Sequence, residues 1–141
     1  MIHLDTSFLI RALVPGSPQD KSLRRWLESG DSFVMSTIAW TEFLCGPLET
    51  RQADLARQIV SDRIAFSEED AIVGARLFND SGRRRGSMFD CMIAATALHF
   101  LRRFGQWLGT GCTKGAFLHG QSFALAFTVA LEREARRRTC P

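Results

Sequence analysis

Short apolar runs alternate with longer amphipathic segments over the first hundred residues, and this alternation limits the possible folds more than any other feature. Strands are expected at residues 2–4, 33–35 and 64–66. Helices are expected at residues 6–13, 20–28, 37–44, 51–61, 68–78 and from residue 87 onward. Ser36 is expected to cap the third of these helices, Ser67 and Asp70 are expected to form a capping box, and residues 93–98 are apolar enough to be buried against the sheet. Strands that alternate with helices need crossover connections, so the pattern predicts an open parallel sheet covered by helices on both faces.

The size and composition fit one compact domain spanning residues 1–141, of which 45% are hydrophobic. No apolar run approaches the length of a membrane span, and no secretory leader pattern precedes the first strand, so we expect a cytoplasmic protein without a membrane partner. The four cysteines are widely spaced and form no C-x-x-C pair. Free or buried thiols are therefore expected, in place of a zinc site or a disulfide framework.

Charge is distributed unevenly along the chain. Residues 1–80 carry a net charge of −4, residues 81–141 carry +7, and sixteen of the eighteen basic residues are arginine. An acidic half beside a basic half is typical of a metal-dependent enzyme that acts on a polyanion. A general preference of the organism for arginine explains the same composition equally well. The clusters at residues 83–85 and 136–138 are either phosphate contacts or solvated surface.

Three acids are placed where they can meet. Asp5 directly follows the first strand, and Glu42 and Asp90 lie near the starts of later helical segments. The carboxyl ends of parallel strands share one edge of a sheet, where proteins of this architecture bind ligands, and three carboxylates there would suit a hard cation. Each acid also has an ordinary interpretation: Asp5 as a helix cap, Glu42 as an exposed helical residue, and Asp90 as the partner of Ser87 in a capping box.

Three motifs, in this order and at these separations, resemble those of PIN-domain ribonucleases, especially the VapC-type toxins of bacterial toxin-antitoxin pairs. Residues 2–10 read IHLDTSFLI, residues 36–46 read STIAWTEFLCG, and residues 86–97 read GSMFDCMIAATA. The likeness covers residues 1–99. It implies a three-layer α/β/α fold with a short central parallel sheet, and the activity of a metal-dependent endoribonuclease.

The resemblance also assigns roles. Asp5 and Asp90 would anchor Mg²⁺ or Mn²⁺, while Glu42 would hold a second cation or position the attacking water. The expected substrate contacts come from two hydroxyls and two arginines: Thr6, Ser7, Arg84 and Arg85. The hydroxyls alternatively orient Asp5, or only satisfy backbone groups of the first helical turn.

The same resemblance implies two kinds of protein partner. A small antitoxin would wrap the pocket and an apolar groove, and two copies of the chain would pair as a homodimer. Trp26 and Trp40 either line that groove or belong to the core. A phosphatase-type hydrolase that uses Asp5 as nucleophile is disfavoured, because it needs a second acid two residues later, where this chain has Ser7.

The last third of the chain departs from the family pattern, which normally supplies a fourth acid. No Asp or Glu occurs between Asp90 and Glu132, and a weak strand at residues 107–108 and a helix at residues 122–137 are the only elements expected there. Three explanations compete: three acids are enough for one metal, Glu132 or Glu134 folds back into the site, or a replaced or frame-shifted segment has weakened the enzyme. The corresponding alternative function is a catalytically weakened or inactive module that binds an antitoxin or RNA.

Overall fold

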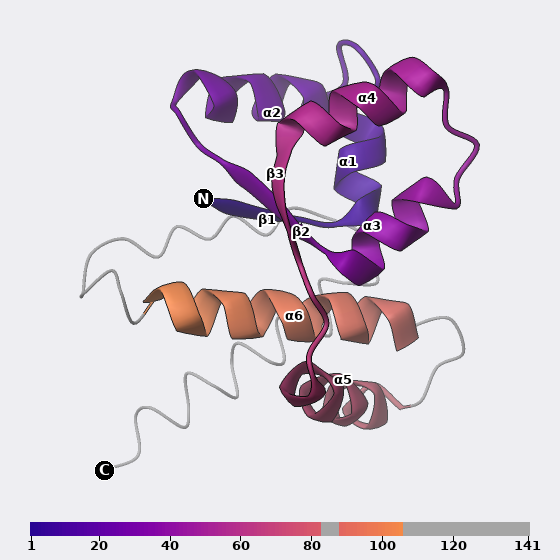
Figure 1. Ribbon diagram of the computed structural model, residues 1–141, viewed down its shortest axis with the longest axis vertical. Coiled ribbons are helices and arrows are strands. Elements are labelled where there is room, and N and C mark those ends of the chain that lie inside the picture. Colours follow the sequence, from indigo (N-terminus) through magenta and orange to yellow (C-terminus); the bar gives the residue numbers. More distant parts are fainter. Residues whose placement is uncertain (83–87, 106–141) are drawn as a thin grey trace.

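The computed structural model describes residues 1–82 and 88–105. The chain forms, in order, β1 (Ile2–Leu4), α1 (Thr6–Ala12), α2 (Pro18–Glu28), β2 (Phe33–Ser36), α3 (Thr37–Leu44), α4 (Thr50–Ile59), β3 (Val60–Ile64), α5 (Glu68–Asp80) and α6 (Met88–Gly105) (Figure 1). The basic loop at residues 83–85, the strand expected at residues 107–108 and the helix expected at residues 122–137 lie outside the described residues.

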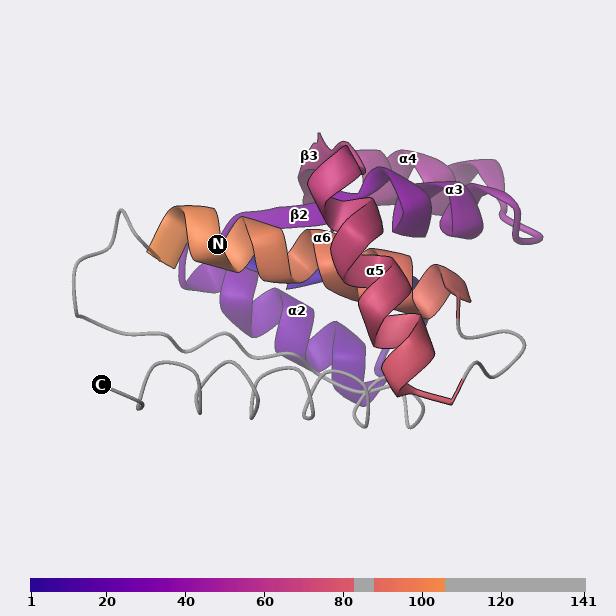
Figure 2. The same ribbon diagram turned by 90° about the horizontal axis from the view of Figure 1, so that it is seen from below.

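The strands form one parallel sheet in the order β1-β2-β3, with Leu4 aligned to Met35 and Met35 aligned to Arg63. Helix α6 runs along one side of the sheet with α5 packed against it, and α1, α2 and α4 lie on the other side (Figures 1 and 2). The prediction of a three-layer α/β/α fold with a short central parallel sheet is confirmed. In the described part of the chain, no helix has the length and apolar character needed to cross a membrane.

The core lies between the sheet and its helices. Its largest fully buried side chains are those of Phe33, Phe43, Leu9, Met35 and Ile93. Trp26 and Trp40 both pack against this core: Trp26 stacks on Phe8 with ring centroids 5.5 Å apart, and Trp40 stacks on Phe43 at 5.3 Å. Of the two interpretations of these residues, the structure therefore supports the core. The Cys45 thiol is free and exposed, and Cys91 is buried.

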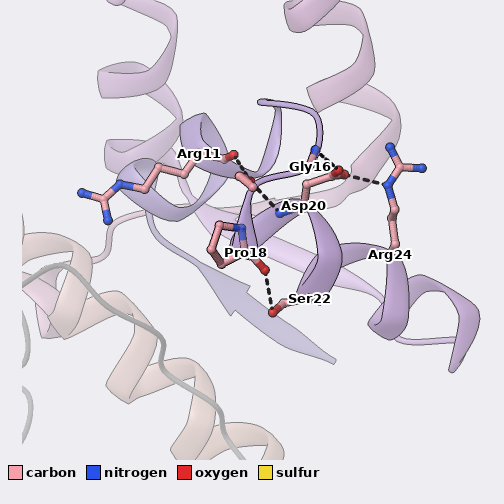
Figure 3. Close-up of polar contacts among 7 residues, drawn as sticks. Arg11, Gly16, Pro18, Asp20, Ser22 and Arg24 are labelled. Carbon is pink, nitrogen blue, oxygen red and sulfur yellow. Dashed lines mark hydrogen bonds and ion pairs between the residues drawn. The ribbon is translucent and has the colours of Figure 1, made fainter.

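A polar network closes the turn between α1 and α2 (Figure 3). Gly16 has a φ of 80°, a left-handed conformation that glycine adopts without steric cost. Its N–H donates to Asp20 Oδ2 at 2.8 Å, and Arg24 Nε donates to Asp20 Oδ1 at 2.7 Å. Ser17 caps α2 by accepting a hydrogen bond from Asp20 N, so the helix begins at Pro18, two residues earlier than predicted.

The third strand was predicted in the wrong place. It spans Val60–Ile64 instead of residues 64–66, and the preceding helix ends at Ile59 instead of residue 61. The pairing with β2 aligns Phe33 with Val60 and Val34 with Asp62, so the register shifts at this point. Because β3 lies at the edge of the sheet that the described residues form, and only part of its surface is buried, it tolerates polar residues that resemble a loop in the sequence.

Helix α5 begins with a capping box and packs against α6. The predicted capping box is confirmed: Ser67 Oγ accepts from Asp70 N, and Asp70 Oδ2 accepts from Ser67 N. The same buried carboxylate lies 3.0 Å from His99 Nδ1, which ties the start of α5 to α6. The predicted burial of residues 93–98 of α6 is also confirmed.

Gly74 of α5 faces α6, and a substitution there probes the distance between the two helices. A Cβ added there would lie 3.6 Å from the Cys91 carbonyl oxygen and 3.7 Å from the Ala95 Cβ, which are ordinary van der Waals distances. We predict that Gly74→Ala raises the free energy of unfolding by about 0.5–1 kcal/mol, because alanine restricts the unfolded chain. Ala75→Gly, at an exposed position of the same helix, is the matched control and should lower it. A lower free energy of unfolding for Gly74→Ala, measured in urea, would contradict the prediction and show that the two helices lie closer together than these distances indicate.

His3 introduces a pH dependence of stability. It is buried in β1, both ring nitrogens lack a hydrogen-bond partner in the described part of the chain, and burial lowers its pKa from 6.5 to about 4. Between these pH values the unfolded chain takes up a proton that the folded protein does not, so stability falls as pH falls, by at most about 3 kcal/mol. His3→Leu should remove this slope in denaturant unfolding followed from pH 7 to pH 4. If the free energy of unfolding depended on pH in the same way in both proteins, the pH dependence could not be assigned to His3.

Candidate active site

Asp5 connects the sheet to its first helix. Strand β1 ends at Leu4, and Asp5 is the N-cap of α1 with an extended backbone. Its Oδ1 accepts a hydrogen bond from Phe8 N at 2.7 Å, and its Oδ2 accepts one from Ser7 Oγ at 3.0 Å. Capping and orientation of the carboxylate therefore occur together, since both donors belong to the first turn of α1.

Thr6 joins two helices at this edge of the sheet. Its buried hydroxyl donates to the Ala39 carbonyl oxygen of α3 at 3.1 Å. Ala39 N in turn donates to Ser36 Oγ, the predicted N-cap of α3, at 3.0 Å. Of the two hydroxyls considered for substrate binding, that of Ser7 contacts the Asp5 carboxylate, whereas that of Thr6 fixes α1 against α3.

The other two acids come from two further helices. Glu42 is exposed on α3, a helix that contacts both α1 and α6. Asp90 is half-buried in the first turn of α6, which follows α5, so it lies after a helix and not at a strand end. Ser87, its expected capping partner, lies outside the described residues.

The charges of the three acids interact. Burial raises the pKa of Asp5; the hydrogen bonds from Phe8 and Ser7 oppose this effect, and the charge of Glu42 adds to it. Burial is also the main cause of the raised pKa of Asp90, followed by the charges of Glu42 and Asp5. Asp5, Glu42 and Asp90 therefore form one electrostatic group, in which burial and the neighbouring negative charges disfavour the ionised state of Asp5 and Asp90.

This group is not a closed set of metal ligands. Among residues 1–82 and 88–105, no three His, Cys, Asp or Glu side chains are grouped so that they could together hold a metal ion. The donor chemistry nevertheless fits a hard cation, because Mg²⁺ keeps several water molecules and typically uses only one or two protein carboxylates together with substrate phosphate. The arrangement can therefore accept an ion that remains partly hydrated.

One charged residue near the group was not anticipated from the sequence. The charge of Arg11, in the last turn of α1, acts on Asp5 and lowers its pKa slightly against the dominant effect of burial. Its position four residues after Ser7 was the available sequence signal, since such residues share a helix face. Arg84 and Arg85, which were expected to contact the substrate, lie outside the described residues.

Comparison with known families identifies the class of protein. The family model of the PIN domain matches residues 2–100. The chain therefore belongs to the PIN-domain family, a family of nucleases that typically use divalent metal ions and act on RNA. Among curated proteins, none matches the chain significantly.

Neutralising Asp5 should stabilise the metal-free protein. Because its folded-state pKa lies above the ordinary value of 3.8, the folded protein binds this proton more tightly than the unfolded chain, and stability is lost as pH rises through the folded-state pKa. Asn caps helices as well as Asp does, so we predict that Asp5→Asn raises the free energy of unfolding at pH 7 in EDTA. The gain should vanish below pH 3.8.

Asp20→Asn is the control with the opposite expected sign. The Gly16 N–H, and after it the Arg24 guanidinium, holds the pKa of Asp20 below its ordinary value, so the Asp20 charge stabilises the fold at neutral pH. Its replacement should lower the stability at pH 7. Equal destabilisation by both substitutions would contradict the account of Asp5.

Proposed function

We propose that this protein is a Mg²⁺- or Mn²⁺-dependent endoribonuclease and the toxin component of a VapC-type toxin-antitoxin pair. The observation that carries the proposal is the electrostatic coupling of Asp5, Glu42 and Asp90 at one edge of a parallel sheet, in a chain of the PIN family. Acids that repel one another without a counterion favour a divalent cation, and RNA backbone cleavage needs such an ion.

Each acid has a distinct role in this proposal. Asp5 and Asp90, whose pKa values are raised, hold the ion, and the exposed Glu42 positions the attacking water or a second ion. The bound ion supplies a nucleophilic water near neutral pH and neutralises charge that builds on the phosphate. Ser7 keeps the Asp5 carboxylate aimed at the site through its hydrogen bond, and Thr6 acts indirectly by holding α3. Arg84 and Arg85 contribute substrate contacts.

The proposed partners follow from the same class. An antitoxin protein neutralises the enzyme in the cytoplasm, and two copies of the single domain pair as a homodimer. The exposed apolar side chains on α1, including Ile10, and those on α3 and α4, Leu44 and Leu55, supply apolar surface for such contacts.

The missing fourth acid favours a second candidate function. No Asp or Glu lies between Asp90 and Glu132, so a metal ion receives fewer carboxylates than the family pattern provides. A protein that has lost catalysis would still bind an antitoxin or RNA. Metal-dependent cleavage separates this binding module from the nuclease.

The test is cleavage of a structured RNA by the purified protein in the presence of Mn²⁺. We predict that EDTA abolishes cleavage and that Asp5→Asn lowers its rate by at least about 100-fold, because a metal ligand is lost while the helix cap is kept. Asp54→Asn is the matched control: Asp54 is exposed on α4, where it pairs with Arg57, so its replacement should leave the rate unchanged.

Two results would contradict the nuclease assignment. Cleavage that survives Asp5→Asn would exclude Asp5 from catalysis. Absence of cleavage by the wild-type protein, together with retained RNA binding, would support the binding module instead.

A further inference from the structure

A single line of side chains along α1 joins the candidate active site to an exposed cation. Asp5 caps the helix, Ser7 donates to the Asp5 carboxylate, and Arg11 lies four residues beyond Ser7. Residues four apart occupy the same helix face, about 5–6 Å from each other at Cβ. Helical side chains generally lean toward the N-terminus of their helix, which in α1 is the end that Asp5 caps.

The Arg11 guanidinium is available for a ligand. Arg11 is exposed, and its side chain extends away from the network of Gly16, Asp20 and Arg24 (Figure 3). Only its backbone carbonyl joins that network, by accepting a hydrogen bond from Ser17 Oγ at 2.7 Å. The ion pairs found in the described part of the chain involve other residues.

Arg11 lies on the helix that Asp5 caps, yet it forms no ion pair with that carboxylate. It therefore neither neutralises the candidate metal-binding group nor loses its own capacity to bind an anion. An unpaired guanidinium offers a planar fork of donors that matches two oxygens of a phosphate.

We propose that Arg11 is a substrate-binding residue. Its guanidinium binds a backbone phosphate of RNA beside the group formed by Asp5, Glu42 and Asp90. This inference rests on the proposed nuclease function and adds to it the residue that holds the polyanion next to three repelling carboxylates. Phosphate contacts position a nucleic acid without reading its sequence, so the contact serves any RNA that the site accepts.

A purely structural role of Arg11 must be separated from this one. A cation in the last turn of a helix interacts favourably with the helix dipole. Arg25 is the matched control, since it is also exposed and also lies in the last turn of its helix, α2. Its helix carries none of the three candidate acids, which belong to α1, α3 and α6.

The experiment measures fluorescence anisotropy of a labelled single-stranded RNA of mixed sequence, about 12 nucleotides long. The full chain carries Asp90→Asn and the buffer contains EDTA, so that the RNA is not cleaved. We expect Arg11→Gln to weaken binding roughly tenfold and to reduce the slope of log K against log salt by about 0.7. Arg11→Lys should retain most of the affinity, and Arg25→Gln should change both quantities much less.

Thermal unfolding and cleavage assays of the same substitutions in the wild-type background distinguish the remaining outcomes. Equal losses of affinity for Arg11→Gln and Arg25→Gln, or an unchanged affinity for Arg11→Gln, would overturn the inference while leaving the nuclease assignment intact. A lower melting temperature of Arg11→Gln with unchanged RNA binding would assign Arg11 to the helix dipole and overturn it as well. Absence of both RNA binding and Asp5-dependent cleavage would overturn the proposed function, and this inference with it.

Discussion

The rest of the site depends on how the Asp5 carboxylate is held at the end of β1. A partly buried carboxylate is unfavourable unless hydrogen-bond donors compensate for the lost hydration. Here the Phe8 N–H and the Ser7 hydroxyl supply those donors, at 2.7 and 3.0 Å. Because both belong to the first turn of α1, the turn that begins the helix also sets the direction of the acid.

Neutral contacts then bring the other acids within electrostatic range. The Thr6 hydroxyl fixes α1 to the Ala39 carbonyl of α3, and Ser36 caps α3 directly after β2. Helix α3 also contacts α6, which carries Asp90. The core and these hydrogen bonds hold together carboxylates whose negative charges repel one another.

Much of this architecture was predictable because its signals are local. The first two strands, the Ser36 cap, the capping box of Ser67 and Asp70, and the apolar stretch of α6 each follow from residues close in the sequence. The third strand was misplaced because its position depends on pairing with Phe33, a contact between distant residues. Polar residues on β3, at the edge of the described sheet, hid that pairing, since side chains that stay exposed need not be apolar.

The site was predictable as a set of candidates but not as an arrangement. The motifs indicated Asp5, Glu42 and Asp90, whereas the interaction of their charges depends on the packing of three helices. The hydrogen bond from Thr6 to Ala39, which spans 33 residues, is one determinant of that packing. The role proposed for Arg11 depends in the same way on the orientation of the Asp5 carboxylate, which the hydrogen bond from Ser7 determines.

The most direct test of the shared acidic site is an NMR titration of the Asp90 carboxyl carbon in the metal-free protein. The account predicts a pKa above the ordinary value of 3.8 in the wild-type protein. In a Glu42→Gln variant the pKa should fall while remaining raised, because burial persists and only the repulsion from Glu42 is lost. An Asp90 pKa that is the same in both proteins would contradict the claim that these acids share one site.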